Sequence, residues 1–214
     1  GKEDLLATLR GILPTDATCI YIRQPAPLGL GHAVLCAHAV VGNEPFFVHL
    51  ADDLIDAGVP VLAQMRDRYA SSGGSVIGVQ QVPRSQTGSY GIVATEDPAG
   101  EYSRIRQMVE KPKPADAPSD LAVVGRYLLS GSIFSRLQKV GRGAGGEIQL
   151  TDGIAALLDD EPVYAYRLKG KRYDCGSKLG YLEATVEYGL RHPELGDRFG
   201  SYIDGLAEAR KSRR

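Results

Sequence analysis

Short apolar runs and amphipathic stretches alternate through the first half of the chain, which is the pattern of strands separated by helices. Strands are expected where β-branched, aromatic or other apolar residues cluster, at 18–23, 46–50 and 75–82. Helices are expected where apolar residues recur every three or four positions, at 5–13, 32–41 and 61–70. The connections are long enough for parallel pairing, and 46–50 has the apolar content of a buried strand.

The pattern changes in the middle of the chain, where three strand-like runs follow one another without helices between them. Such a meander predicts antiparallel additions to the sheet, at 90–95, 102–109 and 123–129. A helix is expected at 148–158, and 163–168 alternates as an edge strand does. We therefore expect an α/β fold with a mixed, mostly parallel sheet flanked by helices.

The C-terminal part of the chain predicts one clear helix, which begins near Ser177, a good N-cap, and ends at His192 and Pro193. Four apolar residues share one face of this helix: Leu179, Leu182, Val186 and Leu190. Residues 207–214 are polar and basic, so we expect a disordered tail there.

Composition narrows the class of protein. The 214 residues are 43% apolar, which suits one domain over residues 1–214 with an ordinary core. The 25 basic and 26 acidic residues give a net charge of −1, which argues against a nucleic-acid-binding protein. No run of 18 apolar residues and no signal peptide is present, so we expect no membrane association and a cytoplasmic location. The three cysteines lack a C-x-x-C pair, so we expect reduced thiols and no zinc site.

Acidic residues follow apolar strands, and strand ends are where open α/β sheets collect ligand-binding groups. Asp52 follows the 46–50 strand and is well placed to hold Mg²⁺, although a turn or helix cap made by Asp52 or Asp53 explains it equally well. Asp174 precedes the helix at Ser177, so it is either a second metal ligand or the cap of that helix, and the cap is the simpler interpretation.

Glu110 and Lys111 end a strand, because Pro112 cannot continue it. Glu110 can accept hydrogen bonds from sugar hydroxyls, and Lys111 can hold a phosphate as a compact cation. The alternative is a solvated ion pair, the usual fate of an adjacent Glu and Lys. Glu147 is likewise either a ligand-facing acid or an acid in the first turn of a helix.

A glycine-containing loop at 24–34 (QPAPLGLGHAV) joins a predicted strand to a predicted helix. Gly29 and Gly31 would let the backbone approach a flat ligand closely, near a helix N-terminus. An ordinary connection between a strand and a helix explains the same spacing. No G-x-x-x-x-G-K-[ST] phosphate loop occurs in the sequence.

Together and in order, these segments resemble one family, the bacterial UTP–glucose-1-phosphate uridylyltransferases, also called UDP-glucose pyrophosphorylases. The resemblance extends over nearly the whole chain, and its last two stretches distinguish this family from other sugar nucleotidyltransferases. The matching stretches are 23–37 (RQPAPLGLGHAVLCA), 49–55 (HLADDLI), 89–93 (SYGIV), 109–114 (VEKPKP), 117–130 (APSDLAVVGRYLLS), 143–154 (GAGGEIQLTDGI) and 170–196 (GKRYDCGSKLGYLEATVEYGLRHPELG).

The resemblance implies a Rossmann-like nucleotidyltransferase fold and the reaction of UTP with α-D-glucose 1-phosphate to give UDP-glucose and pyrophosphate. It also implies Mg²⁺ as the cofactor and a homo-oligomer, either a dimer or a tetramer. Transfer of the uridylyl group in line needs positioning and charge neutralisation rather than a protein nucleophile.

The resemblance further implies a role for individual residues. Asp52 and Asp174 would hold Mg²⁺, and Lys111 would act with Asp52 in catalysis by gripping the phosphate of the sugar. The substrate-binding residues would be Gln24 and Gly29 at the uracil, Tyr90, Gly91, Glu110 and Gly125 at the glucose, and Glu147 as a further acid on the sugar side.

One part of the family pattern has no counterpart in this sequence. The family opens with a strand and a glycine-rich loop, G-x-G-T-R followed by P-K-E-M, which cradles the triphosphate. We therefore expect an N-terminally incomplete domain, with little or no transferase activity from these 214 residues alone. Two alternatives remain: a non-catalytic remnant that binds UDP-glucose, and a thymidylyltransferase-type pyrophosphorylase, against which the stretches GEIQLTD and YDCGSKLGY count.

Overall fold

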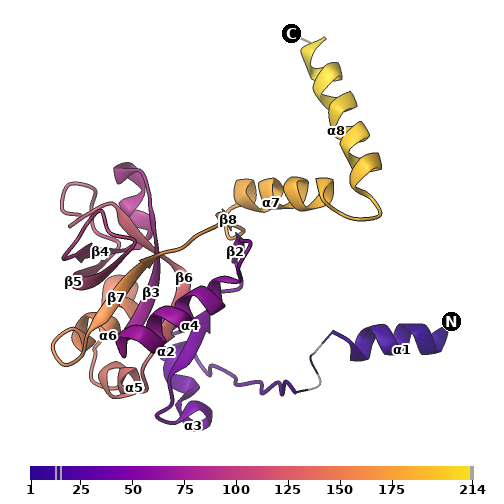
Figure 1. Cartoon of the computed structure of the whole chain (residues 1–214). Helices are drawn as coiled ribbons and strands as arrows, with labels where there is room; N and C mark the ends of the chain where they lie inside the picture. Colours follow the sequence, from indigo (N-terminus) through magenta and orange to yellow (C-terminus); the bar gives the residue numbers. More distant parts are fainter. Residues whose placement is uncertain (13, 15, 213–214) are drawn as a thin grey trace.

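The structure is a computed structural model that describes residues 1–12, 14 and 16–212. Figure 1 shows a central sheet with helices around it and helical segments that project at both ends of the chain. The helices are α1 (Lys2–Arg10), α2 (Leu30–Cys36), α3 (His38–Val41), α4 (Val61–Ser72), α5 (Ser132–Leu137), α6 (Leu150–Leu157), α7 (Lys178–Leu190) and α8 (Gly196–Lys211), with the short 3-10 helices η1 (Arg84–Ser89) and η2 (Ala144–Gly146). The strands are β1 (Phe46–His49), β2 (Asp53–Asp56), β3 (Ser75–Gln81), β4 (Gly91–Thr95), β5 (Tyr102–Glu110), β6 (Leu121–Leu129), β7 (Val163–Arg167) and β8 (Lys171–Asp174).

The main sheet has six strands in the order β1-β6-β3-β7-β5-β4. β6 is central to it, because it pairs with β1 and β3 and its first residues also pair with β4. All nine residues of β6 are buried, as expected for a strand covered on both faces. A second, two-stranded sheet pairs β2 with β8.

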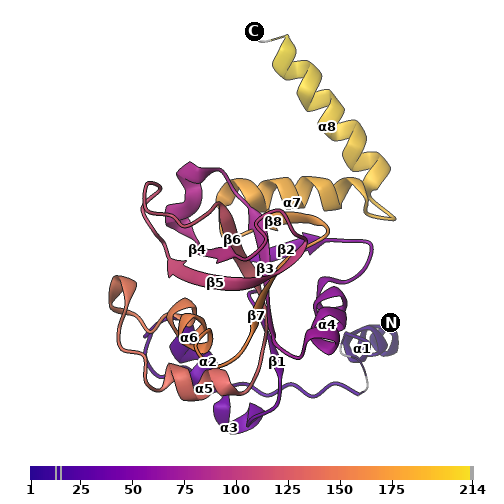
Figure 2. The same cartoon turned by 60° about the vertical axis from the view of Figure 1, so that its left-hand side comes forward.

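Two helical layers cover the main sheet, one on each face, and neighbouring side chains of β3 point into different layers. Ile77 belongs to a core shared with Phe134 of α5 and Ile154 of α6, whereas the neighbouring Val76 packs in a second cluster with Met65 of α4. Figure 2 shows α4 on one side of the sheet and α2, α5 and α6 on the other. Burial of these side chains between the layers is the main force that holds the domain together.

The mixed sheet and its antiparallel additions are confirmed, but the predicted predominance of parallel pairing is wrong. Among the described strands, only β3 and β7 are parallel neighbours. β1 and β3 run in the same direction, yet β6 lies between them and is antiparallel to both. The apolar pattern of a strand does not tell which other strand lies beside it, so an inserted strand from later in the chain escapes this kind of prediction.

Three expected strands differ from the structure. The predicted edge strand 163–168 is β7, an interior strand between β3 and β5. The predicted buried strand 46–50 is β1, an edge strand in which Phe47 is 38% exposed. Residues 18–23 form no strand, and Tyr21 is 93% exposed. β-branched residues favour an extended backbone, but a strand also needs a neighbour to bond with, and none of the described segments pairs with this one.

The predicted last helix is confirmed as α7, in which the Ser177 side chain accepts a hydrogen bond from the Gly180 amide. The chain then continues into α8, which packs on α7 and projects away from the sheet in both views. α8 extends to Lys211, although the sequence predicts a disordered tail from residue 207. An acidic residue in its first turn and basic residues in its last turn complement the helix dipole, which favours this helix.

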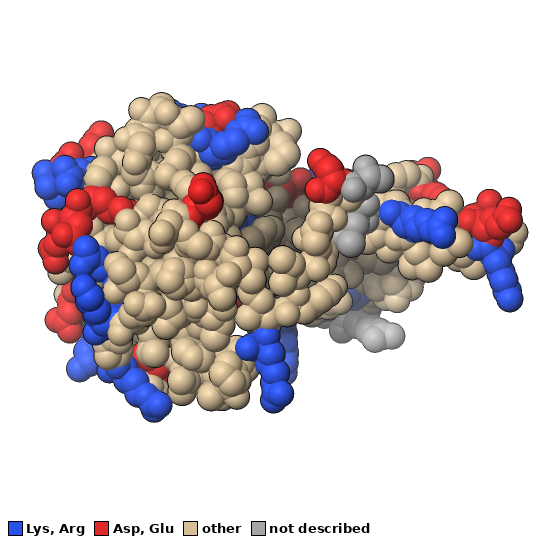
Figure 3. Space-filling view, turned by 90° about the horizontal axis from the view of Figure 1, so that it is seen from below, with Lys and Arg blue, Asp and Glu red and all other residues tan. Residues whose placement is uncertain are grey.

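The exterior of the molecule is mixed in character. α1 has no buried residue, and Leu13, the last member of its predicted apolar face, lies outside the described residues. On the face seen in Figure 3, basic and acidic side chains are interspersed around the rim, and much of the middle is uncharged. Within the described part of the chain, no helix combines the length and the apolar character that a bilayer span requires.

Candidate active site

A cavity of about 350 Å³ opens where the ends of several strands meet. β4 begins where β5 ends, because the two strands pair with Gly91 opposite Glu110. The Lys111 amide donates a hydrogen bond to the Tyr90 carbonyl oxygen at 3.0 Å, which extends this pairing by one step. Seven of the ten candidate residues line the cavity: Asp52, Tyr90, Gly91, Glu110, Lys111, Gly125 and Asp174.

Lys111 has an unusual backbone. Its φ of +44° is the only positive value for a non-glycine residue among the described residues. A side chain in this conformation costs about 1–2 kcal/mol, and such strain collects at functional sites. The Lys111 Nζ lies 3.6 Å from Glu110 Oε1, and its side chain is 52% exposed. The residue with the strained backbone is therefore a lysine at the cavity, and its charged side chain remains accessible to a ligand.

Glu110 is held from its other side by α6. The Thr151 hydroxyl, in the first turn of α6, donates to Glu110 Oε2 at 2.6 Å, so one carboxylate oxygen accepts from Thr151 and the other faces Lys111. Burial, and then the charge of Glu110, raises the pKa of the neighbouring Asp152. Burial also raises the pKa of Tyr127, which keeps this cavity-lining hydroxyl protonated.

Gly125 leaves room for an acidic side chain beside β6. Its φ is +41°, and a Cβ at this position would collide with the Asp53 carboxylate. The requirement for glycine is therefore steric as well as conformational.

Asp52 and Asp174 converge across Gly176. β2 pairs with β8 so that Asp53 lies opposite Asp174, and the Cys175 amide donates to the Asp52 carbonyl oxygen at 2.8 Å. A Cβ at Gly176 would lie 3.0 Å from Asp52 Oδ2 and 3.1 Å from Asp174 Oδ1. The two carboxylates therefore border the same space beside Gly176.

The donor set suits a hard divalent cation. Mg²⁺ takes one or two carboxylates and completes its octahedron with water and phosphate oxygens. The described residues contain no group of three or more His, Cys, Asp or Glu that could hold a metal, so a site at Asp52 and Asp174 would need oxygens from a ligand. The interpretation of Asp174 as the helix cap is wrong, because Ser177 caps α7. The Asp174 carboxylate instead accepts from the Gly176 amide at 3.1 Å.

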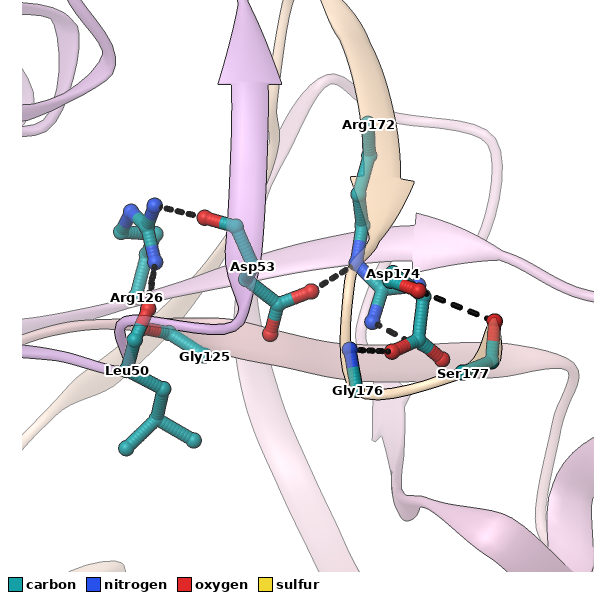
Figure 4. Close-up of polar contacts among 8 residues, drawn as sticks. All are labelled: Leu50, Asp53, Gly125, Arg126, Arg172, Asp174, Gly176 and Ser177. Carbon is teal, nitrogen blue, oxygen red and sulfur yellow. Dashed lines mark hydrogen bonds and ion pairs between the residues drawn. The ribbon is translucent and has the colours of Figure 1, made fainter. Parts of the chain in front are cut away.

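Two arginines hold Asp53 from opposite sides, as Figure 4 shows. Arg172 Nε donates to Asp53 Oδ1 in a largely buried ion pair, and Arg172 Nη2 lies 3.9 Å from Asp174 Oδ2. Arg126 donates to the main-chain oxygens of Leu50, at 2.9 Å, and of Asp53. Burial raises the pKa of Asp53, and the hydrogen bond and charge of Arg172 oppose that rise.

The loop at 24–31 lies beside the cavity and contributes Leu30 to its lining. Gln24 Nε2 donates to the Gly29 carbonyl oxygen at 3.1 Å and lies 2.9 Å from His32 Nδ1. Because a carbonyl oxygen can only accept, the amide nitrogen of Gln24 must face Gly29. The amide oxygen of Gln24 is then the atom that can accept a hydrogen bond from a ligand.

Glu147 lies against this loop rather than on the side of the cavity formed by β5. Two main-chain hydrogen bonds join the segments, from the Gly31 amide to the Ile148 oxygen at 2.9 Å and from the Ile148 amide to the Leu28 oxygen at 2.7 Å. Gly29 has a φ of +101°, and a Cβ there would lie 2.7 Å from the Glu147 Cβ, so only glycine fits. Gln24, Gly29 and Glu147 are therefore adjacent to one another, next to the cavity but not in its lining.

Sequence reasoning missed Arg126, Arg172 and Thr151. Arg126 stands inside an apolar run, and a charge in a buried strand needs partners, which is a usable signal. Arg172 lies two residues before Asp174, and this spacing puts both side chains on one face of a strand. Thr151 has no comparable signal, because its contact depends on how α6 packs against the end of β5.

A larger cavity of about 670 Å³ lies beside α4. The four charged residues that line it, Asp56, Asp67, Arg68 and Lys169, all form ion pairs within the protein. Its charges are thus already compensated, and none of the ten candidate residues lines it. The smaller cavity is therefore the candidate active site.

Comparison with known proteins identifies the family of the chain. A family model for nucleotidyl transferases matches residues 9–189. The UTP–glucose-1-phosphate uridylyltransferase of Staphylococcus haemolyticus is 45% identical over 207 residues, which cover 96% of this chain and 71% of that protein.

Two solved structures align over most of the chain. The UTP-bound UGPase from Acinetobacter baumannii gives a TM-score of 0.84 at 46% identity, over 94% of this chain and 70% of that one. A UDP-glucose pyrophosphorylase complexed with UDP-glucose gives a TM-score of 0.80 at 42% identity, over 87% of this chain and 71% of that one. The matched residues include the whole cavity, and nucleotidyltransferases of this family typically use a divalent metal. The chain belongs to the bacterial UTP–glucose-1-phosphate uridylyltransferases, a family of nucleotidyltransferases.

Proposed function

We propose that the cavity transfers a uridylyl group from UTP to α-D-glucose 1-phosphate, which yields UDP-glucose and pyrophosphate. The observation that carries the proposal is the convergence of Glu110, Lys111 and the facing pair Asp52 and Asp174 at the strand ends. The names of the relatives support it, since they are uridylyltransferases of this type and two solved relatives hold UTP or UDP-glucose.

Lys111 would hold the phosphate of the sugar substrate. A lysine is a compact cation with three donors, and it would offset the repulsion between two phosphate-bearing substrates. Glu110 would accept hydrogen bonds from glucose hydroxyls, because Thr151 occupies only one of its oxygens. The glucose ring would be bordered by Tyr90, Gly91 and Gly125.

The 24–31 loop would bind the uracil. The amide oxygen of Gln24 would accept from the N–H of the base, since the amide nitrogen donates to Gly29. Gly29 would let the backbone approach the flat ring. Glu147 packs against Gly29 and would contribute a nearby acid.

Asp52 and Asp174 would hold Mg²⁺ together with oxygens of the nucleotide. When bound, the ion would neutralise charge on the phosphoryl group that is transferred. The protein's part would be to orient the two carboxylates. The Gly176 amide holds the Asp174 carboxylate by a hydrogen bond, and the Cys175 amide holds the main chain of Asp52. The phosphate oxygen of the sugar would attack the α-phosphorus in line, so positioning and charge neutralisation suffice.

The test is the release of pyrophosphate from UTP and glucose 1-phosphate with Mg²⁺, on protein whose intact mass is recorded in the same sample. Turnover should require both substrates and the metal, and the recorded mass shows whether it comes from more than the 214 residues. Calorimetric binding of UDP-glucose without turnover would select a non-catalytic binding protein, and equal rates with UTP and dTTP would select a thymidylyltransferase. A folded protein with neither turnover nor binding would contradict the proposal.

A homo-oligomer in the cytoplasm is part of the same proposal. α7 and α8 expose large apolar side chains: Leu179, Leu182, Tyr202 and Leu206, each at least 50% exposed. Apolar patches of this kind favour association. Sedimentation equilibrium should show a dimer or tetramer, and a monomer across the accessible concentration range would contradict it.

A further inference from the structure

Arg172 has no role in the proposed chemistry, yet it contacts three separate parts of the site. It donates to the Asp53 carboxylate, lies 3.9 Å from Asp174 Oδ2, and places its guanidinium 5.5 Å from the centre of the Tyr90 ring. Its side chain is only 12% exposed. Burying a charge is unfavourable unless its partners compensate, so the contacts of Arg172 need a reason.

The strands that Arg172 joins are short. β2 and β8 have four residues each and, among the strands that the structure describes, pair only with each other. A two-stranded sheet is marginally stable by itself. Asp52 immediately precedes β2 and Asp174 ends β8, so the separation of the two carboxylates depends on how firmly these strands are held. Main-chain pairing sets the register, but it does not fix the side chains.

Arg126 and Arg172 supply the missing restraint in complementary ways (Figure 4). Arg126 is 4% exposed and holds the backbone on both sides of Asp52, through the oxygens of Leu50 and Asp53. Arg172 holds the Asp53 side chain and reaches toward the carboxylate on the opposite strand. The two arginines together connect β2 to β6 and to β8.

Charge alone does not explain Arg172. A positive charge beside Asp52 and Asp174 repels a metal ion, so through electrostatics Arg172 weakens cation binding. Residues that orient metal ligands strengthen metal binding. The presence of Arg172 is explained if the binding gained by keeping the two carboxylates in place exceeds the binding lost to charge repulsion.

We propose that Arg172 is a positioning residue that acts through Asp53 and Asp174 to keep the Asp52 and Asp174 carboxylates in the arrangement that binds the divalent cation. The proposal rests on the metal assignment made in the proposed function. It extends that assignment to a side chain that would not itself touch the ion.

The experiment compares wild-type protein with Arg172→Gln and Arg172→Lys. Lys171→Gln is the matched control, because it removes a positive charge from the same strand and breaks an exposed ion pair with Glu187 and a contact with the Tyr173 ring. Binding of Mn²⁺ is read from the paramagnetic resonance signal of the free ion, with and without UDP-glucose. We expect both Arg172 variants to bind Mn²⁺ about tenfold to a hundredfold more weakly, and Lys171→Gln to bind as wild type does.

The direction of the change separates the possible roles. If Arg172 acts by charge alone, Arg172→Gln binds Mn²⁺ more tightly and Arg172→Lys is unchanged. If Arg172 only stabilises the fold, the variants lower Tm but bind Mn²⁺ normally below that temperature. Either result would overturn the proposal. Where Arg172→Gln does not fold, Arg172→Lys and Asp53→Asn carry the same measurement, and each should weaken Mn²⁺ binding.

Failure of this proposal is distinct from failure of the proposed reaction. Wild-type protein that binds Mn²⁺ without turnover contradicts the reaction but leaves the Arg172 comparison intact. Wild-type protein that binds no more Mn²⁺ than Asp52→Asn and Asp174→Asn overturns the metal assignment, and the positioning role with it.

Discussion

The two sides of the cavity are built differently. The sheet wall, which comprises Glu110, Lys111, Gly125 and Thr151, stands on the core strands β5 and β6 and on the first turn of α6. The 24–31 loop is irregular up to α2 and is attached to the 148 segment by two main-chain hydrogen bonds. The wall is therefore rigid by construction, and the loop is held at few points.

The unfavourable features of the site lie mostly on the wall. It carries the positive φ of Lys111 and a neighbouring acid, Asp152, whose pKa is raised by burial and by Glu110. Rigid elements can hold such strained groups precisely placed, whereas a loop would relax them. Substitutions on the wall should therefore reduce turnover and alter stability, and substitutions in the loop should mainly weaken nucleotide binding.

Glu110→Gln should have the largest effect. The amide keeps the shape of the side chain but removes the charge that strengthens hydrogen bonds to sugar hydroxyls and to Lys111. We expect kcat/KM for glucose 1-phosphate to fall by about 3 kcal/mol, roughly a hundredfold. The measurement varies glucose 1-phosphate at saturating UTP. The control is Glu96→Gln, because Glu96 forms an exposed ion pair with Arg106. Equal activity of the two variants would contradict the special role of the wall.

Lys111 allows charge and strain to be separated. Lys111→Ala and Lys111→Gly both remove the ammonium, so each should raise the KM for glucose 1-phosphate by roughly thirtyfold, or about 2 kcal/mol. Glycine accepts a φ of +44° without strain. The free energy of unfolding of Lys111→Gly should therefore be about 1 kcal/mol higher than that of Lys111→Ala. Urea unfolding of the two variants checks this, and equal stability would show that the backbone relaxes.

The acidic residues at the strand ends could be predicted from the sequence, but the residues that support them could not. Asp52, Glu110 and Asp174 follow strands in the sequence, and position at a strand end is a local property. β3, α4 and α7 were likewise predictable from the spacing of apolar residues and from the cap at Ser177.

The features that escaped prediction depend on contacts between distant segments. β6 enters between β1 and β3 from later in the chain, and the Arg172–Asp53 pair joins residues 119 positions apart. The 18–23 segment is the opposite case, a strand that was predicted but did not form. Its residues favour an extended backbone, but no described strand pairs with it.

Gly29→Ala tests the loop. Its φ of +101° suits only glycine, and the added Cβ would press on the Glu147 side chain. We expect the KM for UTP to rise roughly fivefold, or about 1 kcal/mol, and Tm to fall by about 2–4 °C, because the added Cβ also presses on the Ile148 main-chain oxygen. Gly42→Ala is the matched control, since Gly42 also has positive φ but has open space around it. A large fall in Tm for Gly29→Ala alone would mean that the loop is part of the core.

Asp152→Asn should have the smallest effect and the clearest dependence on pH. Burial, and then Glu110, raises the pKa of Asp152 above 3.8, whereas its place in the first turn of α6 favours its negative charge. The raised pKa means that the folded protein binds this proton more tightly than the unfolded chain does. The free energy of unfolding should therefore fall as pH rises from 3.8 through the folded pKa.

Asp152→Asn removes this loss, so the variant should be slightly more stable than wild type at neutral pH, and the difference should vanish as pH approaches 3.8. Urea titrations across this range measure the difference. If wild type is instead the more stable protein at neutral pH, the helix dipole outweighs burial, and the wall carries less strain than Lys111 and Glu110 indicate. If the variant is more stable but turns over more slowly, the negative charge beside Glu110 serves the reaction and lowers the free energy of unfolding. Such a trade-off between activity and stability on the wall is what distinguishes it from the loop.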